Sequence, residues 1–205
     1  MKKQLENFVG AVLAGLCIGI GGAVFLCVED RVAGALLFTV GLYAICAHGL
    51  RLYTGKVGYL AEQPPAYLID LAVIWLGNFA GTWLAGTAIR ATRAAGMAEK
   101  AATLCAAKTA DSLWSLLLLG IFCGLLMFIA VDGYGRTQNP LILFVCVAGF
   151  ILSGFEHCIA DMFYFSVAGA WGGRALVCIL AITLGNSLGG VLIPLYRRLG
   201  RKESL

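Results

Sequence analysis

Length, composition and charge restrict the class of protein before any motif is considered. The chain has 205 residues, of which 60% are apolar and only 13% are charged, whereas soluble domains carry about 25% charged residues. This composition excludes a soluble domain and an intrinsically disordered chain. The formal net charge of +4 is too small for a nucleic-acid-binding surface. The sequence therefore predicts an all-α membrane protein, in contact with membrane lipid and without nucleic acid as a partner.

Charged residues divide the apolar sequence into six segments. A helix needs about 20 apolar residues to cross a bilayer, and the first segment is too long for a cleaved signal peptide. The expected spans are 8–28, 32–61, 66–89, 112–131, 140–170 and 174–196. Basic residues near both termini predict that both termini lie in the cytoplasm and that the protein is multi-pass in the inner or plasma membrane. The expected loop between the third and fourth spans argues for the opposite orientation, because it carries Arg90, Arg93, Lys100 and Lys108.

Segments 32–61 and 140–170 are too long to be straight spans. About 30 helical residues extend about 45 Å, which exceeds the roughly 30 Å hydrocarbon core. Both segments also contain polar residues midway, from His48 to Lys56 and from Ser153 to Asp161. Non-helical backbone at membrane depth must be buried in protein or line a cavity. We therefore expect the second and fifth transmembrane helices to be broken and to face each other across a pathway.

A weak internal repeat supports this arrangement. The pattern Gly-Asn-x-x-Gly begins at Gly77 and again at Gly185, 108 residues later, and Gly49 and Gly154 in the two breaks are 105 residues apart. Three spans per repeat force the second copy to enter the membrane inverted, as in many transporters and channels. The sequence therefore predicts six transmembrane helices in two inverted three-helix repeats, 1–90 and 108–199, within a single domain covering 1–205.

His157 and Thr54 are the main candidates for a role in the pathway. His157 is expected near the membrane midplane beside the second break, where ionisable residues are usually functional, and its side chain can exchange a proton near neutral pH. The alternative for His157 is a structural histidine bonded to a carbonyl group. Thr54, in the first break, can donate and accept a hydrogen bond, although Thr is also a common helix cap. Pseudo-symmetry predicts that the two side chains face each other.

The acidic residues beside His157 allow two interpretations. Buried carboxylates are costly without partners, so we expect Glu156 and Asp161 to pair with Arg51, Lys56 or loop amides. The alternative is an intramembrane metal-dependent enzyme that uses Glu156, His157 and Asp161. No second His lies nearby to complete a ligand set, so we favour a protein that is not an enzyme and has no metal or other cofactor.

Two further groups of residues are expected to be mainly structural. The eight Cys residues form no Cys-x-x-Cys pair, which favours free thiols over disulfides or a zinc site. Asn78 and Asn186 each follow a Gly inside an apolar span. An interhelical hydrogen bond and a pore-lining position are equally compatible with this pattern.

Three stretches resemble the formate/nitrite transporter family. Residues 153–163 read SGFEHCIADMF and resemble its fifth-span signature S-G-F-E-H-x-I-A-N-M-F. Residues 52–55, LYTG, resemble the loop of its broken second span, and residues 183–190, TLGNSLGG, resemble its sixth-span T-x-G-N-x-x-G-G. Neither break contains Asn-Pro-Ala, so an aquaporin is not expected.

This resemblance implies an aquaporin-like protomer in a homopentamer, with a pore in each protomer for small monovalent anions or their conjugate acids, such as formate, nitrite or hydrosulfide. It implies that Thr54 and His157 are the central pair and that Asn186 lies near them. It also implies an outer apolar constriction at Phe38, Leu42 and Phe150, and an inner one near Leu52 and Tyr53. Glu156 belongs to the same signature, and basic residues such as Lys56 are expected to attract anions.

The chain also departs from the formate channels. Asp161 replaces the Asn of the signature, Gly124 stands where formate channels commonly have Asn, and the second-span loop is basic at Arg51 and Lys56. The basic loop is more similar to the hydrosulfide-type branch. In the expected mechanism, an apolar ring blocks the bare anion, and His157 protonates or orients the substrate while Thr54 positions it.

Overall fold

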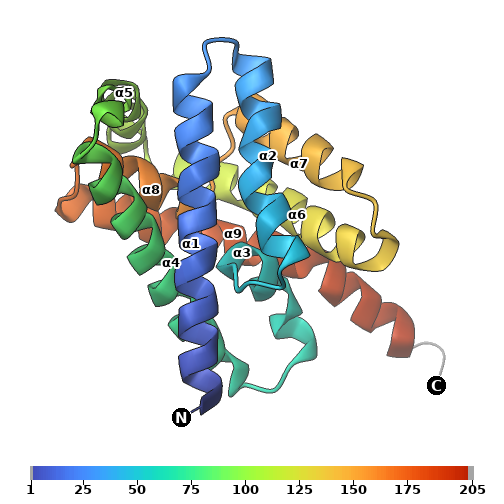
Figure 1. The fold of residues 1–205 in the computed structure, drawn as a ribbon. Helices are drawn as coiled ribbons and strands as arrows, with labels where there is room; N and C mark the ends of the chain where they lie inside the picture. The colour runs from blue at the N-terminus through green and yellow to red at the C-terminus, as the bar shows by residue number, and fades with distance from the viewer. Residues whose placement is uncertain (1, 203–205) are drawn as a thin grey trace.

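The structure, a computed structural model, describes residues 2–202, and all the regular elements in this range are helical (Figure 1). In chain order they are α1 Lys2–Cys27, α2 Arg31–Ala47, α3 Tyr53–Lys56, the 3-10 helix η1 Val57–Glu62, α4 Tyr67–Arg90, the 3-10 helix η2 Arg93–Gly96, α5 Met97–Ala110, α6 Leu113–Thr137, α7 Leu141–Ser153, α8 Cys158–Ala168 and α9 Gly173–Lys202.

Several of these helices are suited to the membrane. Within residues 2–202, α1, α4, α6 and α9 are each long and apolar enough to cross a bilayer. Helices α7 and α8 meet the same test together, as one segment bent by 59°. Helix α2 is apolar but has only 17 residues, and α3 and η1 follow it after a non-helical stretch. The chain is therefore a multi-pass membrane protein.

Glycine allows two pairs of long helices to pack closely. Helix α1 packs against α4, and α6 packs against α9. A Cβ atom on Gly15 of α1 would lie 2.9 Å from the Cα of Gly81, and one on Gly185 of α9 would lie 3.0 Å from the Cα of Gly120. These spaces are too small for any side chain, so the high Gly content sets the distance between helices, as is common in membranes.

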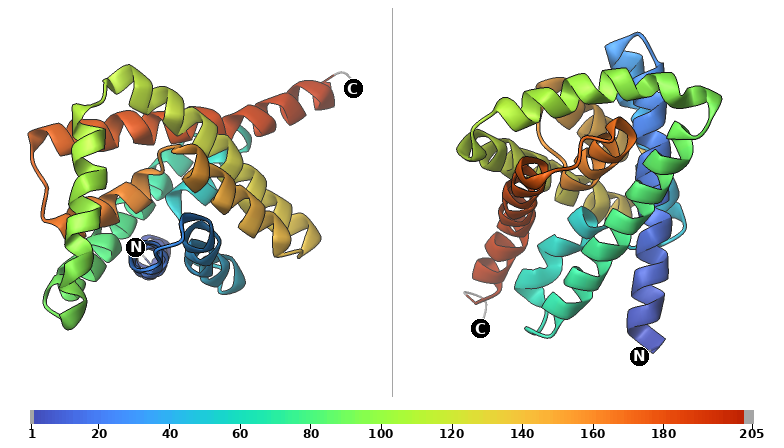
Figure 2. Two further views of the ribbon diagram at one scale, coloured as in Figure 1. Left: turned by 90° about the horizontal axis from the view of Figure 1, so that it is seen from above. Right: turned by 90° about the vertical axis from the view of Figure 1, so that its left-hand side faces the viewer.

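The linker between α4 and α6 differs from the expected loop. It contains η2 and the 14-residue helix α5, which packs against α8 (Figure 2). The interior side of α5 includes Ala101 and Cys105, which are both buried. This linker therefore adds side chains to the region beside α8, and its basic residues do not all lie in a surface loop.

Candidate functional site

The break after α2 is held by the side chain of Asn78. The chain leaves the helix at Gly49, whose φ of 62° lies in the left-handed region that favours glycine. Asn78 on α4 then donates its amide hydrogens to the carbonyl oxygens of Ala11 and Arg51, at 2.8 Å each. Its Oδ1 accepts a hydrogen bond of 2.8 Å from the backbone of Tyr53. One buried amide thus satisfies two backbone groups of the break, the carbonyl of Arg51 and the amide of Tyr53, and ties them to α1 through Ala11.

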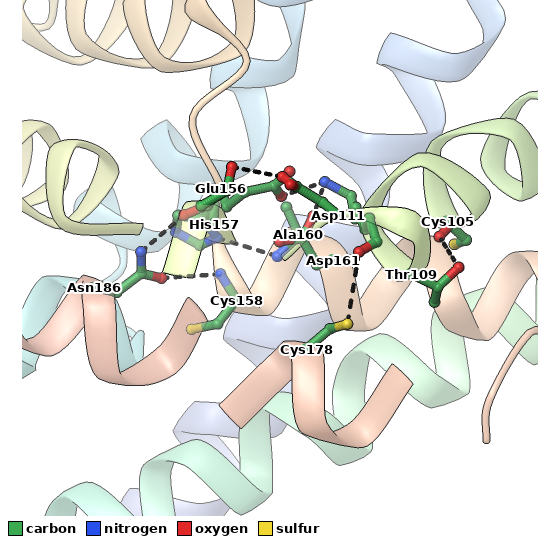
Figure 3. A network of polar contacts seen from close by, with 12 residues as sticks. Cys105, Thr109, Asp111, Glu156, His157, Cys158, Ala160, Asp161, Cys178 and Asn186 are labelled. Carbon is green, nitrogen blue, oxygen red and sulfur yellow. Dashed lines mark hydrogen bonds and ion pairs between the residues drawn. The ribbon is translucent and has the colours of Figure 1, made fainter. Parts of the chain in front are cut away.

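The break between α7 and α8 is held by Asn186 in the same way. Gly154 has a φ of 72°, and Asn186 on α9 donates to the carbonyl oxygens of Gly120 and Glu156 at 2.8 Å each. Its Oδ1 accepts a hydrogen bond of 2.9 Å from the backbone of Cys158 (Figure 3). Asn186 is fully buried. Its position near the central residues is therefore explained by three hydrogen bonds to the backbone.

The structure brings His157 and Thr54 together. The Nε2 of His157 lies 2.9 Å from the Oγ1 of Thr54, and the two side chains are 2% and 0% exposed. His157 is the N-cap of α8, and Thr54 lies in the short helix α3 after the first break. These residues are 103 positions apart in the sequence, so the two breaks form one central site.

A backbone hydrogen bond defines the tautomer of His157. The backbone N–H of Ala160 donates to Nδ1 at 3.1 Å (Figure 3). Because an amide N–H can only donate, Nδ1 carries a lone pair, and the proton of the neutral ring lies on Nε2. The ring therefore points an N–H group toward Thr54. The structural alternative, a bond from the ring to a carbonyl group, is not what the structure shows, because Nδ1 accepts from a backbone amide and Nε2 faces Thr54.

Aromatic side chains cover one side of this pair. The ring of Phe150 stacks on His157, with centroids 5.6 Å apart and an interplanar angle of 23°. Phe38 meets Phe150 edge-on at 6.1 Å. Both Phe38 and Leu42 on α2 are at most 2% exposed. The three apolar residues named by the resemblance thus lie on α2 and α7, which pack against each other, and Phe150 connects them to the central His.

On the other side of the pair lies a cavity that we call the Lys56 vestibule. It has a volume of about 280 Å³, and Lys56 is its only charged lining residue among those the structure describes. Leu52 also lines it and is buried. Tyr53 is buried nearby and forms a 2.8 Å hydrogen bond with the hydroxyl group of Ser187. Within residues 2–202, Lys56 forms no salt bridge.

A second cavity, which we call the Lys108 vestibule, lies at the opposite end of α2. It has a volume of about 510 Å³ and reaches Phe150 and His157. The N-terminal residue of α2, Arg31, lines this cavity, whereas Ala47 at the C-terminus of α2 lines the Lys56 vestibule. The central pair therefore lies between two cavities that open at different ends of the same helix.

The carboxylates beside His157 pair with a residue that the sequence interpretation placed in a loop. Lys108 on α5 forms salt bridges with both Glu156 and Asp161, the latter at 2.9 Å. Burial alone would lower the pKa of Lys108, but the negative charges of Asp161 and Glu156 hold that pKa above its ordinary value. The expected pairing of these acids with Arg51 or Lys56 is wrong, because Arg51 instead lies 3.9 Å from Glu6.

The same geometry bears on the metal-dependent alternative. Among residues 2–202, no three His, Cys, Asp or Glu side chains are close enough together to hold a metal ion. The ring nitrogens of His157 contact Ala160 and Thr54. The carboxylates of Glu156 and Asp161 both form salt bridges with Lys108. All eight Cys residues are free thiols, and five of them are buried.

Comparison with known proteins identifies the family. The family model described as formate/nitrite transporter matches residues 2–196. The chain belongs to the formate/nitrite transporter family. This family member is 25% identical to the formate channel FocA of Haemophilus influenzae, in an alignment that covers 79% of the present chain. It is 26% identical to the nitrite transporter NirC of Salmonella typhimurium, in an alignment that covers 93% of the present chain. These alignments cover 66% and 81% of the two relatives, which are transport proteins and not enzymes.

Solved structures show the same fold for this family member. A structure described as a pentameric formate channel with formate bound superposes with a TM-score of 0.82, at 24% identity and with 97% of each chain covered. A structure described as an FNT family ion channel gives a TM-score of 0.80 at 21% identity, covering 98% of this chain and 89% of the other. The fold of the family is therefore present over nearly the whole chain.

Proposed function

We propose that the protein is a transmembrane channel for small monovalent anions or their conjugate weak acids, of the size of formate, nitrite or hydrosulfide. The observation that carries this proposal is the buried hydrogen-bonded pair of His157 and Thr54 between two cavities at opposite ends of α2. The similarity to a formate channel and to a nitrite transporter supports the substrate class.

The proposed architecture has six spans in two inverted repeats, 1–90 and 108–199, with breaks in the second and fifth spans. The equivalent hydrogen bonds of Asn78 and Asn186 support it, because each Asn binds two carbonyl oxygens and one amide around its own break. The packing of η1 on α9 and of α8 on α4 also matches between the halves. We further propose a homopentamer, as in the similar formate channel, with both termini in the cytoplasm.

Two apolar constrictions would separate the vestibules from the central pair. We assign one to Phe38, Leu42 and Phe150 and the other to Leu52 and Tyr53, all of which are buried. Transfer of an unpaired charge into such surroundings is strongly unfavourable, so an anion crosses as its conjugate acid. Lys56 raises the local concentration of the anion in its vestibule.

His157 orients the substrate in this mechanism. Its Nε2–H faces the central site, while Nδ1 accepts the hydrogen bond from Ala160. A transfer of the Nε2 proton to substrate would leave an imidazolate, so the neutral ring acts as a hydrogen-bond donor and the substrate takes its proton from vestibule water. Thr54 positions the substrate from the opposite break, Asn186 holds the backbone of that site, and Glu156 balances the charge of Lys108.

The test is flux into proteoliposomes, measured in parallel for formate, nitrite, hydrosulfide, acetate and lactate. His157→Phe removes the central donor and is expected to lower flux of the preferred substrate about tenfold or more, because an acceptor left without a partner in a buried site costs about 1–3 kcal/mol. The matched control is His48→Phe, since His48 is the only other His and is exposed at the end of α2.

The outcomes separate the parts of the proposal. Absence of flux for all five compounds with the native protein would reject the substrate class. Native flux that His157→Phe leaves unchanged in rate and pH dependence would reject the role of His157. Equal losses in His157→Phe and His48→Phe would show that the substitution acts through general damage to the protein.

A further inference from the structure

Asp161 has a buried oxygen atom without a hydrogen-bond partner. Its side chain is 2% exposed, and its Oδ1 forms the salt bridge with Lys108 at 2.9 Å. Its Oδ2 has no hydrogen-bond partner among the residues that the structure describes. Such a buried acceptor carries the full cost of its lost hydration. Asp161 also lines the Lys108 vestibule, so water can reach this region.

The second feature is an excess of negative charge around one ammonium group. Glu156 and Asp161 both contact the Nζ atom of Lys108 (Figure 3 shows the two carboxylates side by side), and Glu156 is 8% exposed. One positive charge balances only one of the two carboxylates. Two carboxylates that share a poorly hydrated site do not both ionise readily.

We propose that Asp161 and Glu156 form a proton-binding site in the Lys108 vestibule, in which the two carboxyl groups share one proton above Lys108. The proton enters from vestibule water and returns to it, and only an O–H bond is formed or broken. The bound proton gives the unpartnered oxygen of Asp161 a donor within the pair. Asp161 is the residue that creates the site, because an Asn at this position would leave Glu156 as the one carboxylate paired with Lys108.

Most of the titratable groups around Asp161 and Glu156 are uncharged, so the two carboxyl groups are the ones that exchange a proton. The thiols of Cys105, Cys123, Cys158 and Cys178 and the phenol of Tyr164 lie around Asp161 and are uncharged when buried. His157 is neutral in its capping tautomer. The remaining charges that line the vestibule belong to Glu29, Arg31 and Lys100.

The shared proton sets the charge that an anion meets at this end of the pore, a consequence that rests on the proposed function. The lining residues of the Lys108 vestibule include three basic and three acidic side chains, so the lining is neutral when both members of the pair are ionised. With one shared proton the lining carries +1, which equals the charge that Lys56 gives to the other vestibule. Proton loss therefore removes the attraction for anions at one end only.

Infrared difference spectroscopy of the purified full-length protein tests the site without any transport measurement. We expect native protein at pH 7 to show the carbonyl stretch of a protonated carboxylic acid. Asp161→Asn and Glu156→Gln are each expected to abolish it, because either remaining carboxylate is balanced by Lys108. The matched control is Glu99→Gln, which removes an exposed carboxylate from α5, the helix that carries Lys108. A band absent from native protein, or one that survives both pair substitutions, would overturn the proposal.

The second arm measures anion flux between pH 6 and pH 9. Relative to Asp161→Asn, native protein is expected to lose about fivefold in flux as the pH rises, the effect of one unit charge at roughly 8 Å in a partly hydrated cavity. Glu99→Gln should follow the native profile. Parallel profiles for native protein and Asp161→Asn would overturn the charge effect, whereas absence of flux from every variant would reject the channel proposal and leave the infrared result standing.

Discussion

The two breaks share a backbone scaffold but differ in their side chains. Asn78 and Asn186 make equivalent bonds, and the residues whose carbonyl groups they bind are Arg51 in the first break and Glu156 in the second. The next residue is Leu52 in the first break and His157 in the second. The first break thus supplies a hydroxyl group and an apolar side chain, and the second supplies the imidazole and the carboxylates. The hydrogen-bonded scaffold of the site is thus repeated, whereas its chemistry is not.

The shared scaffold gives the largest expected effect. Asn186→Ala removes three buried hydrogen bonds to the backbone, and Asn78→Ala removes two buried ones and one that is partly buried. Each buried group left unsatisfied costs about 1–3 kcal/mol, so both variants should lose about 3–6 kcal/mol of stability. Thermal unfolding in detergent measures this loss. Asn139→Ala is the control and should shift unfolding much less, because it removes an exposed side chain whose one hydrogen bond within residues 2–202 is to Leu141.

A large loss for one Asn and none for the other would contradict the equivalence of the two breaks. Similar losses would support a duplicated scaffold in which the Asn residues are interchangeable in function. Retained flux in a destabilised Asn186→Ala variant would further separate the scaffold role of this residue from substrate binding.

The charged residues give the next largest effect, and here the two breaks should differ. Lys108→Met leaves Glu156 and Asp161 buried without a cation and is expected to cost about 3–5 kcal/mol. Arg51→Met should cost under about 1 kcal/mol, because Arg51 faces Glu6 at 3.9 Å and the Glu6 side chain is 71% exposed. Unfolding midpoints of the two variants measure the difference, and equal costs would contradict it.

The stability that Lys108 gains from its two carboxylates depends on pH with a defined sign. The pKa of Lys108 is raised in the folded protein, so its contribution to stability is fully present below the ordinary Lys pKa of about 10.4 and is lost only as the pH rises through the folded-state value. Native protein should therefore keep this contribution from pH 6 to pH 9. Lys108→Met should be less destabilised at pH 5 than at pH 8, because protonation relieves its unpaired carboxylates.

The sequence was informative about the scaffold and about the central pair. The offsets of 108 and 105 residues between the Gly and Asn landmarks placed Thr54 opposite His157, and their side chains are 2.9 Å apart. Phe38, Leu42 and Phe150 carried no signal of their own, because apolar residues in apolar helices are not distinguished by pattern. Only the resemblance to a family singled them out.

Lys108 shows why other parts of the site were missed. It lies 48 residues before Glu156, in a short helix that was expected to be part of the loop between the third and fourth spans. A lysine is normally exposed, and no local spacing shows that α5 packs on α8. The tautomer of His157 was equally hidden, since it depends on one backbone amide, that of Ala160. Such contacts arise from tertiary packing and leave no periodic trace in the sequence.

The smallest expected effect concerns what the first break adds to the central pair. Thr54→Val keeps the shape of the side chain but removes the hydroxyl group that lies 2.9 Å from His157. His157 remains fixed by its bond to Ala160, so flux should fall only about threefold to tenfold, the equivalent of one ordinary hydrogen bond of about 0.5–1.5 kcal/mol. Thr54→Ser restores the hydroxyl and should recover the native rate, measured in the same proteoliposomes. A loss as large as that of His157→Phe would mean that the two breaks contribute equally to the substrate site, and their chemical difference would then lie in the vestibules alone.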